Sequence, residues 1–290
     1  MSYSSFQIAT NIGAVKAYNA LAALNKDAQE AELRIATQQK INSVADDTSG
    51  YNTGKALESK VELMKSAQQN VGSAQDMLST AETQLSSIRD MVTDLKAKIA
   101  DSGNSAADLD SLADDIKAIA DEIDSAIQTT KFNDTELLTS TSEAATTGGG
   151  LTFQTGIDTS DELNLVFSEN VATSFGTASE SGTVLNAVDT LVTTSTRANF
   201  EALETSLETF EDNVTASLGK IGNYMQRLES KDEFLTSAIT NSESSVSRLF
   251  DADIAEEQLK ATSASVGAQA STAMLSQLNS EPSNILSLFQ

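Results

Sequence analysis

Residues 57–99 read LESKVELMKSAQQNVGSAQDMLSTAETQLSSIRDMVTDLKAKI, and this stretch decides the fold. Its apolar side chains recur at alternating spacings of three and four, which is typical of a helix that buries one stripe against other helices. The stripe consists of Leu57, Val61, Met64, Val71, Leu78, Ala81, Leu85, Ile88, Val92, Leu95 and Ile99. The pattern predicts one helix of about 40 residues, roughly 60 Å long at 1.5 Å per residue.

The segment that follows is predicted to be a second helix that folds back on the first. Residues 101–104 read as a turn, with Gly103 suited to a left-handed helix end. Ser105 or Asp108 could cap the next helix by accepting hydrogen bonds from its first free backbone N–H groups. The stripe of that helix is Leu109, Leu112, Ile116, Ile119, Ile123 and Ile127. A short loop between two matched stripes predicts an antiparallel pair.

The pattern changes after residue 130 to glycine-rich turns and short alternating runs. Residues 151–153 and 163–167 read as β-strands, with a turn at 156–158 between them. Helical spacing returns from about Leu185 and predicts another helix of forty residues or more, with the stripe Leu203, Leu207, Phe210, Val214, Ile221, Met225, Leu228, Leu235, Ile239, Val246 and Leu249. The predicted fold class is therefore mainly α, with long antiparallel helices from both chain ends forming a coiled-coil bundle and a small β-hairpin region in the middle.

Both chain ends carry long, Ala/Ser-rich helical patterns with a thin apolar stripe. The stripe of residues 6–40 is Ile8, Ile12, Val15, Tyr18, Leu21, Leu24, Ala28, Ala31 and Ile35, and the looser stripe of residues 251–290 is Ile254, Leu259, Val266, Ala270, Ala273 and Met274. An isolated amphipathic helix is marginal in water, so each stripe needs another helix against it. The last residues include Ile285, Leu286, Leu288 and Phe289, and other copies of the chain are the simplest cover for them.

Composition excludes most catalytic chemistry. The 290 residues include no Cys, His or Trp and a single Pro, Pro282. Without His or Cys there is no zinc site of the usual ligand set, no thiol nucleophile and no Ser-His-Asp triad. We therefore expect no enzymatic activity and no cofactor. The absence of Cys also rules out disulfides, so stability outside the cell would come from packing and assembly.

The charge of the chain is strongly acidic and unevenly distributed. The formal net charge is −24, which argues against nucleic acid and against an anionic membrane surface as partners. Between Lys131 and Lys220 the only basic residue is Arg197, against fourteen Asp and Glu. This distribution predicts a solvated middle and packed ends, while adaptation to salt is the alternative explanation. Residues 1–10 have no secretory signal, and no segment approaches the ~20 apolar residues of a membrane span.

Two acidic motifs stand at the junctions between helical segments. Asp46 and Asp47 lie in the polar stretch 40–50, and Asp251 and Asp253 stand just before the last helix. Asp and Asn oxygens suit calcium, but the spacing fits no EF-hand loop. We favour helix capping as the role of both motifs, with no metal bound.

Seven stretches, in their order along the chain, resemble bacterial flagellin, the subunit of the flagellar filament. Residues 40–50 (KINSVADDTSG) look like the family's R-I-N-S-A-x-D-D-A-A-G segment, and residues 218–229 (LGKIGNYMQRLE) look like its L-G-A-x-Q-N-R-L-E. The others are Thr10-Asn11, 128–138, 153–156, 251–257 and 282–288, which are similar to the family's I-N-T-N, Q-x-x-F-N-G-x-x-L-L, F-Q-I-G, D-A-D-x-A-x-E and P-Q-N-V-L-S-L-L. Each match is weak alone, but the ordered set covers both terminal thirds.

The resemblance implies a domain organisation. In flagellins both chain ends pair as an inner coiled coil, the longer helices form a surrounding tube, and outer domains are inserted in the middle. Only about fifty residues separate the two helical halves here, so we expect a minimal form without large outer domains. The expected divisions are 1–41 and 251–290 for the inner coiled coil, 42–130 and 185–250 for the outer tube, and 131–184 for the small β-hairpin region.

The resemblance further implies a structural subunit that self-assembles into the flagellar filament for swimming motility. We expect the apolar positions of both ends to make the subunit contacts, namely Ile8, Ile12, Val15, Leu21, Leu24, Val266, Leu278, Ile285, Leu286, Leu288 and Phe289. The implied partners are further copies of the chain in a helical homopolymer, a flagellin export chaperone, the flagellar export apparatus, and hook-associated and cap proteins. The implied location is the extracellular filament, after type III export without a cleaved signal peptide.

One segment departs from the family pattern. Flagellins sensed by the animal Toll-like receptor carry a segment like L-Q-R-V-R-E-L-A-V on the long helix. The matching stretch here begins Leu85-Ser-Ser87-Ile88-Arg89-Asp90, so Ser87 stands in place of the first arginine. Leu85, Ile88, Arg89 and Asp90 form the candidate receptor-contact region.

Two other functions remain open from the sequence. A hook-filament junction protein resembles flagellin at both ends, although residues 282–288 and the small middle favour a filament subunit. A helical signalling hairpin, like the cytoplasmic part of a chemoreceptor, would need neither a β region nor an apolar C-terminus.

Overall fold

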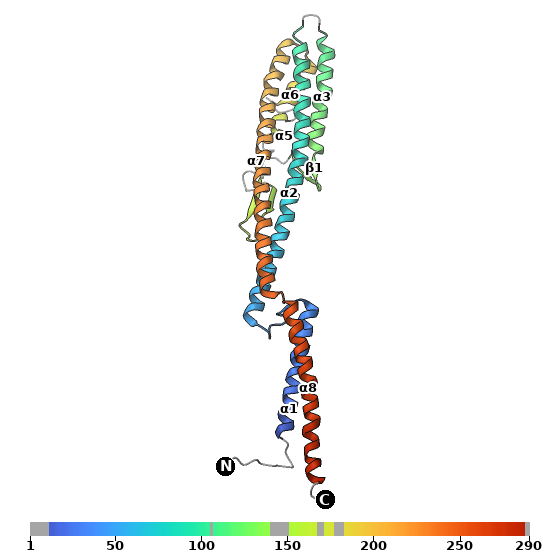
Figure 1. Cartoon of the computed structure of the whole chain (residues 1–290). Coiled ribbons are helices and arrows are strands. Elements are labelled where there is room, and N and C mark those ends of the chain that lie inside the picture. The colour runs from blue at the N-terminus through green and yellow to red at the C-terminus, as the bar shows by residue number, and fades with distance from the viewer. Residues whose placement is uncertain (1–11, 105–106, 140–150, 167–170, 177–182, 288–290) are drawn as a thin grey trace. The chain divides into compact units, whose positions relative to one another are not determined.

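The structure is a computed structural model that describes residues 12–104, 107–139, 151–166, 171–176 and 183–287, with side chains described up to residue 280. Its elements in chain order are α1 (Ile12–Thr37), α2 (Thr48–Asp101), α3 (Leu109–Thr129), β1 (Lys131–Phe132), β2 (Thr135–Glu136), β3 (Leu151–Gln154), β4 (Glu162–Leu165), α5 (Val171–Phe175), α6 (Val184–Thr193), α7 (Arg197–Phe250) and α8 (Ile254–Ser287). The mainly helical fold class is confirmed (Figure 1).

The chain divides into two compact units. One, here called the terminal unit, comprises Met1–Val61 and Asn241–Gln290, and the other, the middle unit, comprises Glu62–Thr240. The helices α2 and α7 contribute residues to both units. Each unit is described by itself below.

The middle unit is a helical bundle whose core is the stripe that opened the sequence. From Val61 onward, every predicted stripe position of α2 is buried, and eight positions of the α7 stripe are buried as well. The amide of Gln68 donates to Asp232 over 2.9 Å, and Lys96 is paired with Glu211. Residue numbers thus fall along α7 as they rise along α2, so the two helices are antiparallel.

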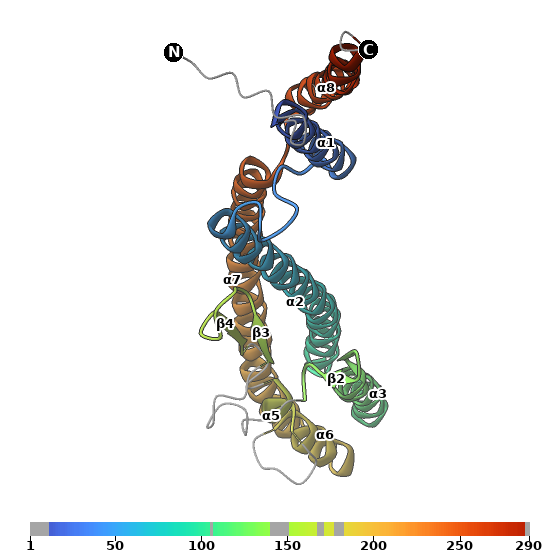
Figure 2. The same ribbon diagram turned by 90° about the horizontal axis from the view of Figure 1, so that it is seen from below.

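The predicted hairpin of α2 and α3 is confirmed, and the Asp108 cap with it. The Lys98 ammonium lies 2.7 Å from the Asp115 carboxylate across the pair, and the two helices run side by side in Figures 1 and 2. Asp108 accepts a hydrogen bond from the Ser111 N–H at 3.4 Å and one from its hydroxyl at 2.9 Å. The Ser111 side chain, and then its N–H, hold the pKa of Asp108 below its usual value.

The middle segment holds more helix than the alternating pattern predicted. Strands β3 and β4 pair antiparallel, with Leu151 opposite Leu165, as expected. The short helix α5, which follows the hairpin, was not predicted. Phe175 of α5 packs its ring 5.0 Å from the ring of Phe210 and is fully buried with Val171. This tertiary burial, rather than local periodicity, explains a helix of five residues, which is too short to show a period.

The β3–β4 hairpin is fastened to the long helices by side-chain hydrogen bonds. The amide of Asn70 in α2 donates to the Gln154 carbonyl at 3.2 Å. The Val166 N–H, just after β4, donates to the Tyr224 hydroxyl of α7 at 3.4 Å. The hairpin therefore belongs to the bundle of the middle unit.

Candidate assembly surface

The terminal unit is built around the pair of helices α1 and α8, which lie side by side in both views (Figures 1 and 2). Small residues make up the seam between them: Ala31, Ala261 and Ala264 are buried, and Gly267 faces Leu24. A β-carbon at position 267 would lie 3.1 Å from Leu24 Cδ1. Small side chains let the two backbones approach closely, so the seam is narrow and holds little apolar surface.

The predicted stripes of the two ends do not form this seam throughout. On α1, Leu21 and Leu24 are half-buried and Ala31 is buried, but Ile12, Val15 and Tyr18 are exposed. On α8, all six predicted stripe members are exposed. The predicted stripe of α8 and the start of the α1 stripe are therefore exposed in the single chain, and their cover by other copies stays a prediction. Alanine occurs on every face of these helices, which blurs the period that the sequence offers.

Several of the larger apolar residues, namely Val15, Tyr18, Leu33, Leu259 and Val266, lie instead on the far side of their helix from the seam, and these two far sides are here called the outer faces. At 100° per residue, Val15 and Leu33 lie roughly 160° round α1 from Ala31, and Leu259 lies about as far from Ala261 on α8. Leu259 is 70 % exposed and Val266 is 60 % exposed. The exposed large apolar residues of the pair are Ile12, Val15, Tyr18, Leu33, Ile254, Leu259, Val266 and Met274. The described part of the chain leaves both outer faces without a cover.

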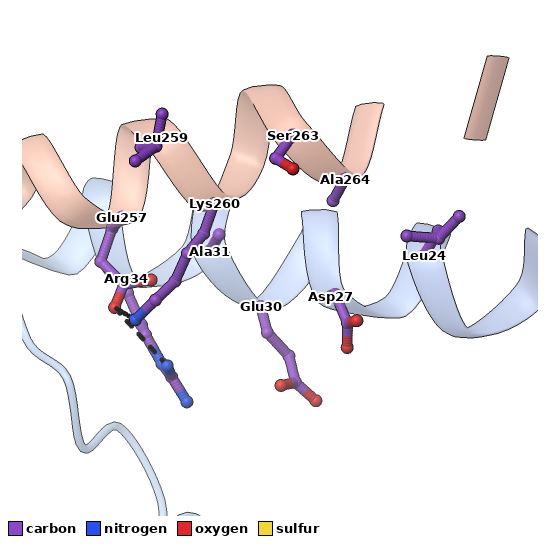
Figure 3. A pocket seen from close by; sticks show the side chains of 10 residues that line it. All are labelled: Leu24, Asp27, Glu30, Ala31, Arg34, Glu257, Leu259, Lys260, Ser263 and Ala264. Atoms are coloured by element: carbon purple, nitrogen blue, oxygen red, sulfur yellow. Dashed lines mark hydrogen bonds and ion pairs between the residues drawn. The ribbon is translucent and has the colours of Figure 1, made fainter. Parts of the chain in front are cut away.

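The α1–α8 pair also carries a charged groove, which Figure 3 shows from close by. Arg34 of α1 and Lys260 of α8 both approach one oxygen of Glu257, Oε1, at 3.7 and 3.0 Å. Glu257 is almost fully buried, and within the part of the chain that the structure describes its other oxygen, Oε2, has no hydrogen-bond partner. Asp27 and Glu30 point to the same side of the pair in Figure 3, and the groove holds about 470 Å³. The Glu256 and Glu257 side chains, mainly by hydrogen bonding, hold the pKa of Lys260 above its usual value.

The acidic junction motifs are helix caps and turn stabilisers. Asp47 Oδ1 accepts from the N–H groups of Ser49 and Gly50 at the start of α2, and Asp253 Oδ1 accepts from the Ala255 N–H at the start of α8. Asp46 accepts from two backbone N–H groups, those of Asn42 and Ser43, at 3.0 and 2.8 Å. The capping interpretation of the sequence is thus confirmed. Across the described residues, no three acidic side chains are placed to hold a metal ion.

The two connections that enter and leave the α1–α8 pair are joined to each other. Gln39 and Asp251 form an isolated antiparallel bridge. On either side of it, the Lys40 N–H donates to the Phe250 carbonyl at 2.7 Å, and the Ala252 N–H donates to the Gln38 carbonyl at 2.9 Å. The segments 38–40 and 250–252 are therefore held together at the base of the pair.

The predicted assembly residues fall into three groups in the structure. Val15 and Val266 lie on the outer faces, Ile12 is also exposed, and Leu21, Leu24 and Leu278 are half-buried. The side chains of Ile285 and Leu286, and the residues Ile8, Leu288 and Phe289, lie outside the described residues. The described members are therefore divided between exposed and half-buried positions, and their role in assembly stays a prediction.

Two residues of the candidate receptor-contact region are buried and so cannot contact a receptor. Leu85 and Ile88 are fully buried in the core of the middle unit, because they belong to the α2 stripe. Arg89 and Asp90 are exposed. Only the charged pair could therefore meet a receptor, and the two apolar positions are corrected to core residues.

Two parts of this surface were not predicted as site residues. Leu33 and Leu259 are exposed on the outer faces. The seven-residue spacing from Leu259 to Val266 was a usable signal, since seven residues make about two turns and return to the same face. Glu257 was quoted only as part of a motif, and a lone Glu near a helix start gives no sign that its carboxylate is buried.

No described helix combines the length and the apolarity needed to cross a membrane.

Comparison with known proteins assigns the family. The family model for the bacterial flagellin N-terminal helical region matches residues 8–143, and the model for the C-terminal helical region matches residues 205–289. The chain is 30 % identical over 167 residues to "Putative flagellin YvzB" of Bacillus subtilis (strain 168), which covers 58 % of this chain and 95 % of that protein. It is 27 % identical over 181 residues to "Flagellin" of the same strain, covering 58 % of this chain and 60 % of that protein.

A solved structure shares the fold. The "Structure of putative flagellar hook-associated protein from Vibrio parahaemolyticus" aligns with a TM-score of 0.59 at 16 % identity, covering 71 % of this chain and all of the other. That identity is low enough for the likeness to concern the fold alone. With both family regions matched in order and flagellin relatives of Bacillus subtilis, the chain belongs to the flagellin family, and it is a non-enzymatic structural subunit of the bacterial flagellum.

Proposed function

We propose that this chain polymerises into the flagellar filament itself and is not a component of the hook-filament junction. The observation that supports this most is the pair of uncovered outer faces of α1 and α8. Burial of one Val or Leu side chain away from water is favourable by about 1.5–3 kcal/mol of free energy. Eight large apolar residues are exposed on one helix pair, so their burial against neighbouring subunits would strongly favour association.

The narrow seam explains why the pair would need those neighbours. Its buried residues are mostly alanine, and alanine gives little hydrophobic stabilisation on burial. Ordering one residue costs on the order of 1–2 kcal/mol of backbone entropy. Contacts within one chain would offset only part of that cost, so complete ordering of the terminal pair would be coupled to assembly.

The contact between subunits must repeat without closing into a ring, because a filament is an open helical polymer. A surface patch that meets a different patch on the next copy generates an open helix when the rotation does not close. The α1 and α8 outer faces are different patches on opposite sides of one pair, which suits such a head-to-tail arrangement. The same two faces would form a closed ring if the rotation between subunits closed, so the proposal requires a rotation that does not close.

The remaining partners follow from the same proposal. Passage through a narrow export apparatus in an unfolded state suits a chain without disulfides, which needs no change of redox state outside the cell. A cytosolic chaperone would cover the apolar α8 before export, and cap and hook-associated proteins would meet the two ends of the polymer. No cleaved signal is needed on this route.

Electron microscopy of the purified full chain tests the proposal. Seeded with sheared fragments of its own polymer, the protein should grow into filaments of unlimited length. A variant that ends at residue 280 should keep the helical signal of the middle unit and fail to polymerise. Short rings or a persistent monomer from the full chain, or normal filaments from the shortened one, would contradict the proposal.

A further inference from the structure

The charged groove of the α1–α8 pair contains a buried acceptor without a donor. The side chain of Glu257 is 6 % exposed. Both cations beside it, Arg34 and Lys260, approach its Oε1, and Oε2 has no partner. A buried carboxylate oxygen that accepts no hydrogen bond loses its interactions with water and gains nothing in return. The groove is therefore incomplete in the single chain.

The chemistry of the groove specifies what would complete it. Its lining includes three acids, Asp27, Glu30 and Glu257, and two bases, so the charge balance is negative. Among the described residues, no ion pair is found for Asp27. Between these charges lie apolar groups, including Leu24 and the buried Ala31 and Ala264. A side chain with an aliphatic stem and a cationic head fits this combination, because the stem covers apolar surface while the head meets the carboxylate.

We propose that a Lys or Arg side chain of a second copy of this chain enters the groove in the polymer and donates to Glu257 Oε2. The inference rests on the proposed filament function, which supplies the second copy. The proposed hydrogen bond would add a polar contact between subunits to the apolar contacts of the outer faces. Apolar contacts set the strength of assembly, but they do not fix how far one subunit slides along the next. A charge-assisted hydrogen bond at 2.7–2.9 Å fixes both distance and direction.

The arrangement also explains why both cations of the groove bind the same oxygen. Arg34 and Lys260 both approach Oε1, so Oε2 is the buried carboxylate oxygen that a further donor could satisfy, once a small side-chain shift admits it. A third cation can then bind without displacing either of them. The contact would assemble only when both terminal helices are in place, since Arg34 comes from α1 and Glu257 from α8.

The adjacent residue provides a matched control. Glu256 also pairs with Lys260, at 2.9 Å, but its side chain is exposed. Glu257→Gln and Glu256→Gln therefore remove the same charge one residue apart and leave the volume unchanged. We expect Glu257→Gln to raise the critical concentration for polymerisation about tenfold, as loss of a hydrogen bond to a charged group implies. Glu256→Gln should leave it within about twofold.

Seeded polymerisation of the full chain, with sedimentation of the polymer, measures both variants. If the wild-type chain does not polymerise, the proposed filament function fails and this inference with it. If the wild-type chain polymerises and Glu257→Gln matches it, no cation of another copy binds Oε2 and the inference alone is overturned. Equal effects of the two substitutions would likewise overturn it, because then only net charge matters. A reconstruction of the polymer gives a second readout, in which a nitrogen of another copy's Lys or Arg should lie within hydrogen-bond distance of Glu257 Oε2.

Discussion

The ring of Phe250, the last residue of α7, packs directly over the α-carbon of Gly54 in α2. A β-carbon added at position 54 would overlap the ring, so only glycine allows this approach. Tyr51 meets the same ring edge-on, with centroids 6.2 Å apart, and the Lys55 ammonium lies 5.6 Å from its centre. The contact fixes the end of α7 against the start of α2, next to the bridge between Gln39 and Asp251.

Gly54→Ala should therefore destabilise the terminal unit. An added group that must displace a packed ring costs typically about 1–3 kcal/mol. Gly72 provides the control, because a β-carbon there meets nothing within 4 Å in the middle of the same helix. Gly72→Ala should stabilise by about 0.5–1 kcal/mol, since alanine favours the helix. Urea unfolding followed by circular dichroism measures both, and a stabilising Gly54→Ala would contradict the packing described.

The Asp46 carboxylate should give the loop before α2 a stability that depends on pH. Backbone hydrogen bonds from Ser43 and Asn42 are the main reason that the pKa of Asp46 is lowered from its ordinary value of 3.8. A group whose pKa is lower in the folded state stabilises the fold above its unfolded pKa, and the contribution is lost as the pH falls through the folded pKa. Asp46→Asn should thus destabilise at pH 6, and the difference from the wild type should shrink only below pH 3.8.

The thermal midpoint of both chains, measured as a function of pH, checks this. Asp90→Asn is the control, because Asp90 is exposed on α2. Its difference from the wild type should stay small at every pH. A difference for Asp46→Asn that persists unchanged to pH 2 would show that the hydrogen bonds do not distinguish the charged carboxylate.

The outer face of α8 should affect assembly without affecting the fold of one chain. Leu259→Gln replaces a side chain that is 70 % exposed, so the unfolding free energy should change by less than about 0.5 kcal/mol. Burial of a leucine between subunits is worth about 1.5–3 kcal/mol, so the critical concentration should rise about 10- to 100-fold. Gln258→Ala, at the preceding residue, should leave the critical concentration nearly unchanged. Equal critical concentrations for wild type and Leu259→Gln would argue that this face stays in water.

The packing of α1 against α8 should depend on the side-chain volume at position 267. Gly267→Val adds a branched side chain where Leu24 already lies within 3.1 Å of a β-carbon, so it should weaken the α1–α8 contact and assembly with it. The double variant with Leu24→Ala makes room again and should recover part of the loss. Sedimentation of the polymer at fixed protein concentration compares the three chains. No recovery in the double variant would mean that the two residues do not share one site.

The sequence predicted the middle unit well and the terminal pair poorly, for a physical reason. Large residues such as Leu85 and Phe210 stand out among polar neighbours, so their spacing reveals the buried stripe. In α8 the buried seam is Ala261 and Ala264, while Leu259 and Val266 face outward. A rule that places the largest apolar residues against the partner helix of the same chain selects the wrong face of α8, because Leu259 and Val266 are exposed there.

Other features depend on contacts that no local pattern records. The cap at Asp108 follows from neighbouring residues, and it was predicted. The short helix around Phe175 depends on Phe210, far along the chain, and it was not. The burial of Glu257 likewise depends on Arg34 of α1, so the charged groove could not be predicted from the sequence of α8 alone.

The central claim is that the outer faces of α1 and α8 are contact surfaces between copies of this chain. The most direct measurement is a reconstruction of its polymer by electron cryomicroscopy at a resolution that shows side chains. We expect Val15, Tyr18, Leu259 and Val266 to be buried against neighbouring subunits in an open helical filament. A filament in which these four side chains remain exposed to solvent would contradict the account.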